Sequence, residues 1–432
     1  MLDDLFEFLQ GAVTPYHAAA MAAAWLDAAG YNRLEEADYW NLEAGKGYYI
    51  TRNGSSVIAW RVPEHAIGGW RITASHSDSP CWKIKNEKVE NDGCVRLSVE
   101  GYGGMIMSTW LDRPLTVAGR VMVKTEDGIE SRLVNIDDDL LVIPSLAIHM
   151  QRNVNKGKEF NPQIDMQPLW GPVGCRSLTD VLCEELAVQP EDILDRDLQL
   201  VTRQQPTRLG PDGEYFLAPR IDDLECAATT LLAFLDAAPD CDSACAPVWA
   251  MFDNEEVGSS SRMGAESSYL RDVLDRIIGS IPHSAQAAQQ AMANSCMLSA
   301  DNAHATHPSF PQKADPCAPV HMGEGVVVKY NASQKYTTNA VSGAIFKEIC
   351  RKAGVPLQVF TNRADEPGGS TLGNLQSHTL PIPMADIGLA QLAMHSAVET
   401  AAVADADHMI NAVEEFYRVH LRALGDGTYT LE

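Results

Sequence analysis

Hydrophobic residues recur along the first part of the chain with two different spacings. Over residues 3–30 they stand three or four positions apart, which predicts two helices separated by the Thr-Pro pair at 14–15. Residues 47–62, GYYITRNGSSVIAWRV, combine aromatic and β-branched side chains with an Asn-Gly pair at 53–54. This pattern predicts two strands joined by a tight turn. The chain is therefore expected to begin with a helical pair followed by a β-hairpin.

Residues 84–215 differ from the regions on either side. They hold many short alternating segments, such as CVRLSVE, LTVAGRVMV and RLVNI. Alternation with a period of two is typical of strands that bury one face. These segments predict a separate β-rich unit, in which the polar and irregular residues 153–172 are expected to form a loop region.

From residue 217 onward, apolar runs of strand length alternate with longer segments of helical periodicity. The predicted strands are APVWAMFD, SCMLSAD, PLQVFT and MADIGLA, and the predicted helices are LECAATTLLAFLDAA, SYLRDVLDRIIGSI, NAVSGAIFKEICRKAG and residues 398–424. This alternation predicts an α/β fold, with a mostly parallel central sheet flanked by helices. Sites in such sheets lie beyond the carboxyl ends of the strands.

Composition and charge narrow the class of protein. The 432 residues include 33 Lys and Arg against 58 Asp and Glu, a formal net charge of −25, and 45% of the residues are hydrophobic. This balance indicates a globular protein and argues against nucleic-acid or anionic-membrane partners, which require a positive surface. The sequence also contains no apolar run of the roughly 18–20 residues that a membrane helix needs.

The N-terminus and the cysteines predict a cytoplasmic location. The first residues, MLDDLFEFLQ, are acidic where an export signal carries Lys or Arg. The ten cysteines are scattered and form no Cys-x-x-Cys motif. Because a disulfide framework is typical of much shorter secreted chains, we expect these cysteines to be reduced.

Several predicted strands are followed by residue types that bind metal ions. These residues are His76 with Asp78, Asp222 with Asp223, Glu255 with Glu256, Asp301 and His395. Taken alone, each has a simpler explanation, since acidic pairs are common in solvated loops and Asp before a helix is a usual N-cap. Five such places in one α/β domain indicate a shared site instead. Mixed imidazole and carboxylate ligands fit Zn²⁺ or Mn²⁺.

Five motifs identify a family resemblance. In order they are SHSDSP, PRIDDL, FDNEEVGS, SADNAHATHP and QLAMHS, and they resemble the M18 aspartyl aminopeptidases, which are two-metal aminopeptidases. The stretches GYGGMIMSTWLDRPLTVAGRV, LAIHMQR and VKYNASQKYTTNAVS agree with the same family, so the resemblance runs from about Leu5 to His420. One loop departs from the family pattern Asp-x-Pro-Cys-Gly, because Gly368 stands where Cys is usual.

The resemblance implies a set of metal ligands. His76 and Asp301 would bind one ion, Glu256 and His395 would bind the other, and Asp222 would bridge the two. Two cations about 3.5–4 Å apart need a shared anion, which an aspartate supplies. The implied cofactors are two divalent ions per subunit, Zn²⁺ in the first place, with Mn²⁺ or Co²⁺ as alternatives.

Three further residues have implied catalytic roles. Glu255 would be the general base that takes a proton from the metal-bound water, and Asp78 would orient His76. We expect the two adjacent glutamates to lie in an extended segment, so that one faces the metals and the other faces the water. His149 would stabilise the tetrahedral intermediate, and by resemblance it would reach the site of a neighbouring subunit.

The implied substrate is a peptide with a free N-terminus and an acidic first residue. Lys329 would bind the acidic side chain through its positive charge. Gly369 and Ser370, in the loop GGSTLG, would line the same pocket with backbone N–H and hydroxyl groups.

The spacing of the implied ligands predicts the domain organisation. The gap between His76 and Asp222 is the longest in the set and contains the β-rich segments. We therefore expect a discontinuous catalytic domain, residues 1–85 and 217–432, with residues 86–216 inserted as a β-rich oligomerisation domain. The resemblance further implies a homo-oligomer, a tetrahedral dodecamer.

Two other functions stay open at this point. The chain could assemble into a scaffold or cargo-binding particle with a vestigial peptidase site, although its complete ligand set argues against this. A related two-metal deacylase or carboxypeptidase would use the same chemistry. A requirement for a free α-amine in the substrate would separate an aminopeptidase from that third class.

Overall fold

The chain divides into two units. The computed structural model describes residues 1–89, 93–240, 245–281 and 284–432. The first unit comprises Met1–Asp78, Pro206–Met394 and Glu399–Glu432, and the second comprises Ser79–Gln205 and His395–Val398.

The limits of the second unit differ from the expected insert, 86–216, for a reason that lies in strand pairing. β5 (Cys81–Val89) already belongs to the sheet of the second unit. β11 (Thr207–Leu209) pairs with β12 (Tyr215–Ala218), which in turn pairs with β20 (Glu399–Ala402) of the first unit.

A mixed sheet forms the centre of the first unit. Within the described residues it has nine strands, in the order β1-β2-β3-β13-β4-β14-β18-β16-β17. Their bounds are β1 Asn32–Arg33, β2 Gly47–Arg52, β3 Ser56–Arg61, β4 Gly69–His76, β13 Cys245–Phe252, β14 Cys296–Ala300, β16 Val326–Tyr330, β17 Leu357–Thr361 and β18 Met384–Gly388. Strands β13, β4, β14 and β18 pair in parallel at its centre, whereas β3 and β16 pair antiparallel with their neighbours β13 and β18. The predicted α/β fold with a mostly parallel central sheet is confirmed.

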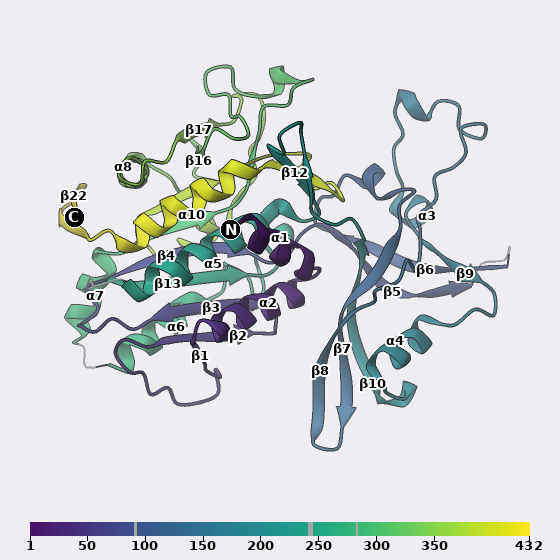
Figure 1. The fold of residues 1–432 in the computed structure, drawn as a ribbon, viewed down its shortest axis with the longest axis horizontal. Coiled ribbons are helices and arrows are strands. Elements are labelled where there is room, and N and C mark those ends of the chain that lie inside the picture. The colour runs from purple at the N-terminus through teal and green to yellow at the C-terminus, as the bar shows by residue number, and fades with distance from the viewer. Residues whose placement is uncertain (90–92, 241–244, 282–283) are drawn as a thin grey trace. The chain divides into compact units, whose positions relative to one another are not determined.

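Helices cover both faces of this sheet (Figure 1). They are α1 Leu2–Gly11, α2 Pro15–Ala28, α5 Ile221–Ala237, α6 Tyr269–Gly279, α7 Ala285–Ala293, α8 Ala340–Ala353, α9 Leu372–Gln376 and α10 Val403–Arg418. Side chains of α1, α2, α5, α8 and α10 pack with Trp249 on one face, and side chains of α6 pack with Val248 on the other. Because successive strand residues point to opposite faces, both faces of β13 are buried, which explains its unbroken apolar sequence.

The structure confirms the elements predicted at the start of the chain and corrects the helix predicted near its end. Thr14 caps α2 and separates it from α1, and β2 and β3 form the predicted hairpin. The prediction of one helix over 398–424 is wrong at both ends. Residues Glu399–Ala402 pair with β12, and β21 (Leu421–Gly425) pairs with β22 (Thr428–Leu431), so inter-strand hydrogen bonds replace helical ones there.

The second unit is built on an antiparallel sheet, whose described residues form six strands in the order β8-β7-β10-β5-β6-β9. Its other strands are β6 Cys94–Tyr102, β7 Leu115–Thr125, β8 Gly128–Asn135, β9 Leu169–Pro172 and β10 Ile193–Thr202. Helix α4 (Leu178–Leu186) buries Leu178 and Leu182 in the same apolar cluster as these strands. The loop region expected over 153–172 also contains the short helix α3 (Pro162–Asp165) and β9.

The structure also describes the cysteines and the length and polarity of the helices. The nine cysteines in the described residues are free, and Cys241 lies outside them. Among the described helices, none combines the length and the apolar character needed to cross a membrane.

Candidate metal centre

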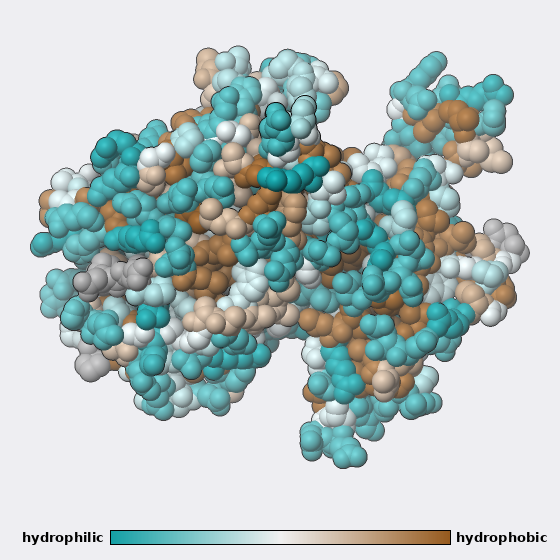
Figure 2. Space-filling view, in the orientation of Figure 1, coloured by the Kyte–Doolittle hydropathy of each residue, from teal (hydrophilic) through white to brown (hydrophobic). Residues whose placement is uncertain are grey.

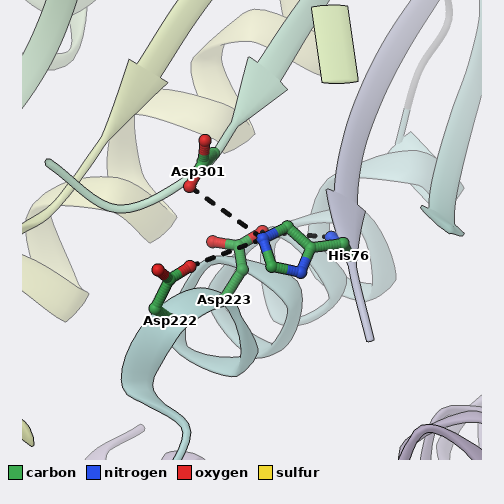
Figure 3. Close-up of side chains that lie close together, drawn as sticks. All are labelled: His76, Asp222, Asp223 and Asp301. Carbon is green, nitrogen blue, oxygen red and sulfur yellow. Dashed lines mark hydrogen bonds and ion pairs between the residues drawn. The ribbon is translucent and has the colours of Figure 1, made fainter. Parts of the chain in front are cut away.

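Acidic and imidazole groups converge at the carboxyl ends of two parallel strands (Figure 3). His76 is the last residue of β4, and Asp301 directly follows β14. The register pairs Ser299 with Ala74, so residues 301 and 76, two positions further along each strand, come level at the sheet edge. Asp222 and Asp223 reach the same point from the first turn of α5. Candidate ligand atoms of His76, Asp222, Asp223 and Asp301 lie within 4.8 Å of one another.

The imidazole of His76 is held at both nitrogens. Its Nε2 lies 3.4 Å from Asp222 Oδ1 and 4.0 Å from Asp301 Oδ1. Its Nδ1 lies 3.0 Å from the carbonyl oxygen of Asp78 and 3.5 Å from Asp78 Oδ1. Asp78 is fully buried, and its contact with the ring fits the orienting role expected for it.

The two aspartates of α5 are positioned by long-range hydrogen bonds, so they do not act as an ordinary N-cap. Both have non-helical backbone angles, and Arg220 occupies the N-cap position. The N–H of Asp222 donates to Glu399 Oε2 at 3.0 Å, and Asp223 Oδ2 accepts the N–H of His76 at 3.0 Å. Sequence reasoning named Asp223 beside Asp222 but assigned it no separate role, and it did not single out Glu399. Asp223 had a signal in its position beside Asp222, but nothing local points to Glu399.

The adjacent glutamates lie in a single turn of 3₁₀ helix, Glu255–Val257, so the expectation of an extended segment is wrong. The turn follows Asn254, which has a left-handed backbone conformation with φ 64°. It is held by Asp78, whose Oδ1 accepts the N–H of Glu255 at 3.0 Å and whose Oδ2 accepts the N–H of Glu256 at 3.1 Å. One buried carboxylate therefore connects His76 with the turn that carries both glutamates.

The electrostatics of the cluster favour a bound cation. Burial raises the pKa of Glu255 to about 8, and it raises the pKa values of Asp223 and Glu256 well above their usual range. Burial opposes the charge of His76, but Asp223 and hydrogen bonds to Asp222 and Asp78 raise the pKa of the imidazole. A divalent ion would neutralise these crowded carboxylates, and one imidazole with several carboxylates is a donor set that suits zinc. The residues present therefore fit a metal centre.

Lys329 lies beside this cluster. Its Nζ donates to the carbonyl oxygen of Asp301 at 2.6 Å and lies 3.3 Å from Asp301 Oδ2. The side chain is 3% exposed, and the ring centre of Tyr336 lies 5.4 Å from Nζ. Although burial opposes its charge, Asp301 raises the pKa of Lys329 above its usual value, so the ammonium is charged.

The remaining predicted residues lie in loops. Gly369 and Ser370 are exposed in the segment before α9. A side chain at Gly368 would meet Asn362, because a Cβ there would lie 2.5 Å from Asn362 Oδ1. The glycine that departs from the family pattern is thus matched to its neighbour in this chain.

Two predicted histidines belong to the second unit. His149 is exposed in a turn. His395 has a left-handed backbone conformation with φ 67°, and its Nδ1 lies 2.9 Å from the carbonyl oxygen of Gly104. The first unit by itself therefore brings together seven of the predicted residues: His76, Asp78, Asp222, Glu255, Glu256, Asp301 and Lys329.

Known proteins match this chain over nearly its whole length. The model of the family described as Aminopeptidase I zinc metalloprotease (M18) matches residues 8–417. Probable M18 family aminopeptidase 2 of Clostridium novyi is 38% identical over 428 residues, which cover 96% of this chain and 98% of that protein. A protein of the same description from Pseudomonas entomophila is 36% identical over 424 residues, covering 96% and 97%.

Solved structures agree with these relatives. The cryo-EM structure of the Ape4 and Nbr1 complex matches with a TM-score of 0.92 at 33% identity, covering 96% of this chain and 85% of that chain. The mApe1 dodecamer of S. cerevisiae matches with a TM-score of 0.85 at 25% identity, covering 96% and 95%. The family match, the full-length relatives and the cluster at the sheet edge lead to one conclusion: this chain belongs to the M18 family of zinc metallo-aminopeptidases.

Proposed function

We propose that this chain is a two-metal aminopeptidase that removes N-terminal residues, preferably Asp or Glu, from peptides. The observation that carries the proposal is the convergence of His76, Asp222 and Asp301 at one edge of the sheet, beside a pair of glutamates held by Asp78. The raised pKa values of the surrounding carboxyl groups support a site built for cations.

The ligands divide into two sets. His76 and Asp301 would hold one ion, Glu256 and His395 would hold the other, and Asp222 would be shared between the two sets. Bound divalent ions, with Zn²⁺ first and Mn²⁺ or Co²⁺ as alternatives, would supply Lewis-acid activation of a water molecule and of the peptide carbonyl. His76 is already oriented for this role by the contacts that Asp78 makes with Nδ1.

Proton transfer falls to Glu255. This carboxylate accepts the proton of the attacking water and delivers it to the nitrogen of the leaving peptide. The backbone N–H of Glu255 is fixed by Asp78, which limits the movement of the base relative to His76.

The acidic preference rests on Lys329. In a chain of net charge −25, this is a buried cation at the border of the metal cluster. Gly369 and Ser370 would complete the pocket with backbone N–H and hydroxyl groups. The substrate is a peptide with a free N-terminus and an acidic first residue.

The second unit is proposed to mediate self-association. It exposes many large apolar side chains, and Figure 2 shows brown surface over the region of β7, β10 and α4. In the described part of the second unit, the exposed large apolar residues are Ile106, Ile129, Leu133, Leu146, Ile148, Met150, Ile164, Leu169, Val173 and Leu194. Exposed apolar surface of this kind marks protein–protein contacts. We propose that the chain forms a homo-oligomer, a tetrahedral dodecamer. In it, His149 reaches the site of a neighbouring subunit and stabilises the tetrahedral intermediate. The cytoplasmic location stays a prediction from the sequence.

Peptides that differ only in their first residue test the proposed specificity. The panel carries Asp, Glu, Asn, Gln or Ala in front of one common sequence, and release of the first residue is followed by mass spectrometry. We expect the peptides that begin with Asp or Glu to have the highest kcat/KM. We expect Lys329→Met to bring their kcat/KM closer to that of the neutral peptides. Equal cleavage of all five peptides would keep the aminopeptidase and reject the role of Lys329. Cleavage of N-acetylated peptides would instead favour a deacylase or a carboxypeptidase.

A further inference from the structure

A cavity of about 770 Å³ lies beside β16 and β17 in the first unit. Its walls are residues 330–335 with Thr338 on one side and residues 361–368 on the other. Pockets for small ligands span roughly 300–1,000 Å³, so this volume is sufficient for part of a peptide. Most of the lining side chains are polar or charged, which makes an apolar occupant a poor match.

The segment after β16 connects the cavity with Lys329, which contacts Asp301. Tyr330 follows Lys329 on β16, but its side chain points to the opposite face, beside α8. Lys335, in the cavity wall, directly precedes Tyr336, whose ring lies 5.4 Å from the Nζ of Lys329. Lys335 is therefore one residue away from the side chain that contacts Lys329.

The walls carry two basic and two acidic side chains, Lys335 and Arg363 against Asp365 and Glu366. Glu366 pairs with Lys313, outside the walls, at 2.6 Å. Arg363 forms two hydrogen bonds with the Asp365 carboxylate, at 2.7 and 2.8 Å. Lys335 is exposed, and its Nζ donates to the carbonyl oxygen of Gly368 at 2.7 Å. In the part of the chain that the structure describes, no carboxylate forms an ion pair with Lys335. A carbonyl uses one of its three N–H donors and leaves the positive charge unneutralised.

Buried hydrogen bonds hold the two walls in place. Asp386, on β18, is fully buried, and its Oδ2 accepts both the N–H and the hydroxyl of Thr337, at 2.5 and 2.6 Å. Its Oδ1 accepts the hydroxyl of Thr371 at 2.5 Å. The segment after Lys335 and the segment after Gly368 are thus fixed to one carboxylate. A wall that is already ordered loses little conformational freedom when it binds a ligand.

We propose that this cavity is an anion-binding subsite of the peptidase, in which Lys335 binds a carboxylate of the peptide substrate. The inference rests on the proposed function, because it assigns the occupant from the neighbouring metal cluster. The carboxylate has three sources in a peptide: the side chain of the first residue, the side chain of the second residue, or the C-terminus. Lys335 offers the same charge and the same N–H donors to each of these three carboxylates. The test therefore uses peptides that differ in the position of the carboxylate.

The test uses four tripeptides on the metal-loaded full-length enzyme. They are Asp-Ala-Ala amide, Ala-Asp-Ala amide, Ala-Ala-Ala with a free C-terminus, and Ala-Ala-Ala amide as the neutral reference. For each, kcat/KM is expressed relative to the reference, in wild type, Lys335→Met and Lys335→Arg. Lys46→Met is the matched control, because it removes an exposed positive charge elsewhere in the first unit.

We expect Lys335→Met to lose the preference for a carboxylate at one of the three positions in the peptide. For one of the three anionic peptides, Lys335→Met lowers the ratio to the neutral reference about tenfold, as expected for a charge-assisted hydrogen bond. Lys335→Arg and Lys46→Met keep the wild-type ratio for that peptide. Unchanged ratios in Lys335→Met, or an equal change in Lys46→Met, overturn the inference while the aminopeptidase stands. If the wild-type enzyme cleaves none of the four peptides, the proposed function and the inference fall together. Should Lys335→Met fail to fold, Lys335→Gln takes its place and must show the same tenfold loss.

Discussion

The carboxylate of Asp78 accepts the backbone N–H of Glu255 at 3.0 Å, although the two residues are 177 positions apart. Its second oxygen accepts the N–H of Glu256 at 3.1 Å, and its first lies 3.5 Å from the Nδ1 of His76. A single buried side chain thus contacts the histidine proposed to bind metal and holds the turn that carries the proposed base. The family resemblance suggested the first of these roles, and the structure adds the second.

Replacing this carboxylate should impair both roles at once. In Asp78→Asn, the amide nitrogen would face one of the two backbone N–H groups, so one hydrogen bond of the turn is lost. Substitution of groups that support metal ligands typically costs 10–100-fold in metal affinity or activity, and we expect kcat/KM to fall by about that factor. Steady-state kinetics together with the metal content per subunit measure the effect. Asp127→Asn, at an exposed site, is the control, and wild-type kinetics in Asp78→Asn would contradict the positioning role.

The proposed base can be separated from the metal ligands. Glu255→Gln keeps the size of the side chain and removes its ability to accept a proton. We expect kcat to fall by about 10²–10⁴-fold, the usual contribution of general acid–base catalysis, while the enzyme keeps its bound metal. The exposed Glu126→Gln should behave like wild type. Near-normal turnover in Glu255→Gln would show that another group moves the proton.

A buried glutamate near the cluster should make stability depend on pH. Burial raises the pKa of Glu225 to about 8 from its ordinary value of 4.5; the hydrogen bond from Asn302 opposes this shift, and the charge of Asp405 adds to it. Between these two values the folded chain keeps a proton that the unfolded chain releases, so the free energy of unfolding decreases as the pH rises through this window. Glu225→Gln removes that contribution.

Thermal denaturation of both proteins across pH 4.5 to 8 tests this linkage. With the metal concentration held constant, the Tm of wild type should fall more steeply than the Tm of Glu225→Gln. Parallel curves would mean that Glu225 is ionised at neutral pH in the folded chain.

The stability of the loops around the cavity should depend on the carboxylate of Asp386. In Asp386→Asn, the amide would place a donor against the hydroxyl and N–H groups that the carboxylate accepts. Leaving such buried groups unpaired costs about 1–3 kcal/mol of stability. We expect a lower Tm and a higher KM, with a smaller change in kcat. Thr371→Ser keeps the hydroxyl and should have the Tm and KM of wild type. Thr371→Val removes it and should lower the Tm and raise the KM, as Asp386→Asn does. A wild-type Tm in Asp386→Asn would show that these hydrogen bonds do not stabilise the loops.

The parts of the molecule that sequence reasoning recovered are governed by local signals. His76 and Asp301 end apolar strands, and parallel pairing brings those ends to one edge of the sheet. Helix α2 begins after Thr14, a capping residue followed by proline. The neighbouring residues predict each element, and the general rule for parallel sheets brings the two strand ends together.

Other features depend on partners far along the chain. Glu399 and Asp386 act through hydrogen bonds that span 177 and 49 residues, and no local pattern reports them. Helix α7, AQAAQQAMA, went unpredicted because its apolar residues are mostly small alanines, and Ala291 is its single buried residue in the described structure. The strands at the two ends of 398–424 likewise arise from pairing with β12 and β22.

The most direct test of the account asks whether the metals are required for removal of N-terminal residues. The purified protein is stripped of metal, refilled with Zn²⁺, Mn²⁺ or Co²⁺, and incubated with free and N-acetylated versions of the same peptides, which are read by mass spectrometry. The account predicts stepwise loss of single N-terminal residues, from the free peptides alone and only after metal is restored. Cleavage by the stripped protein, or equal cleavage of the N-acetylated peptides, would contradict it.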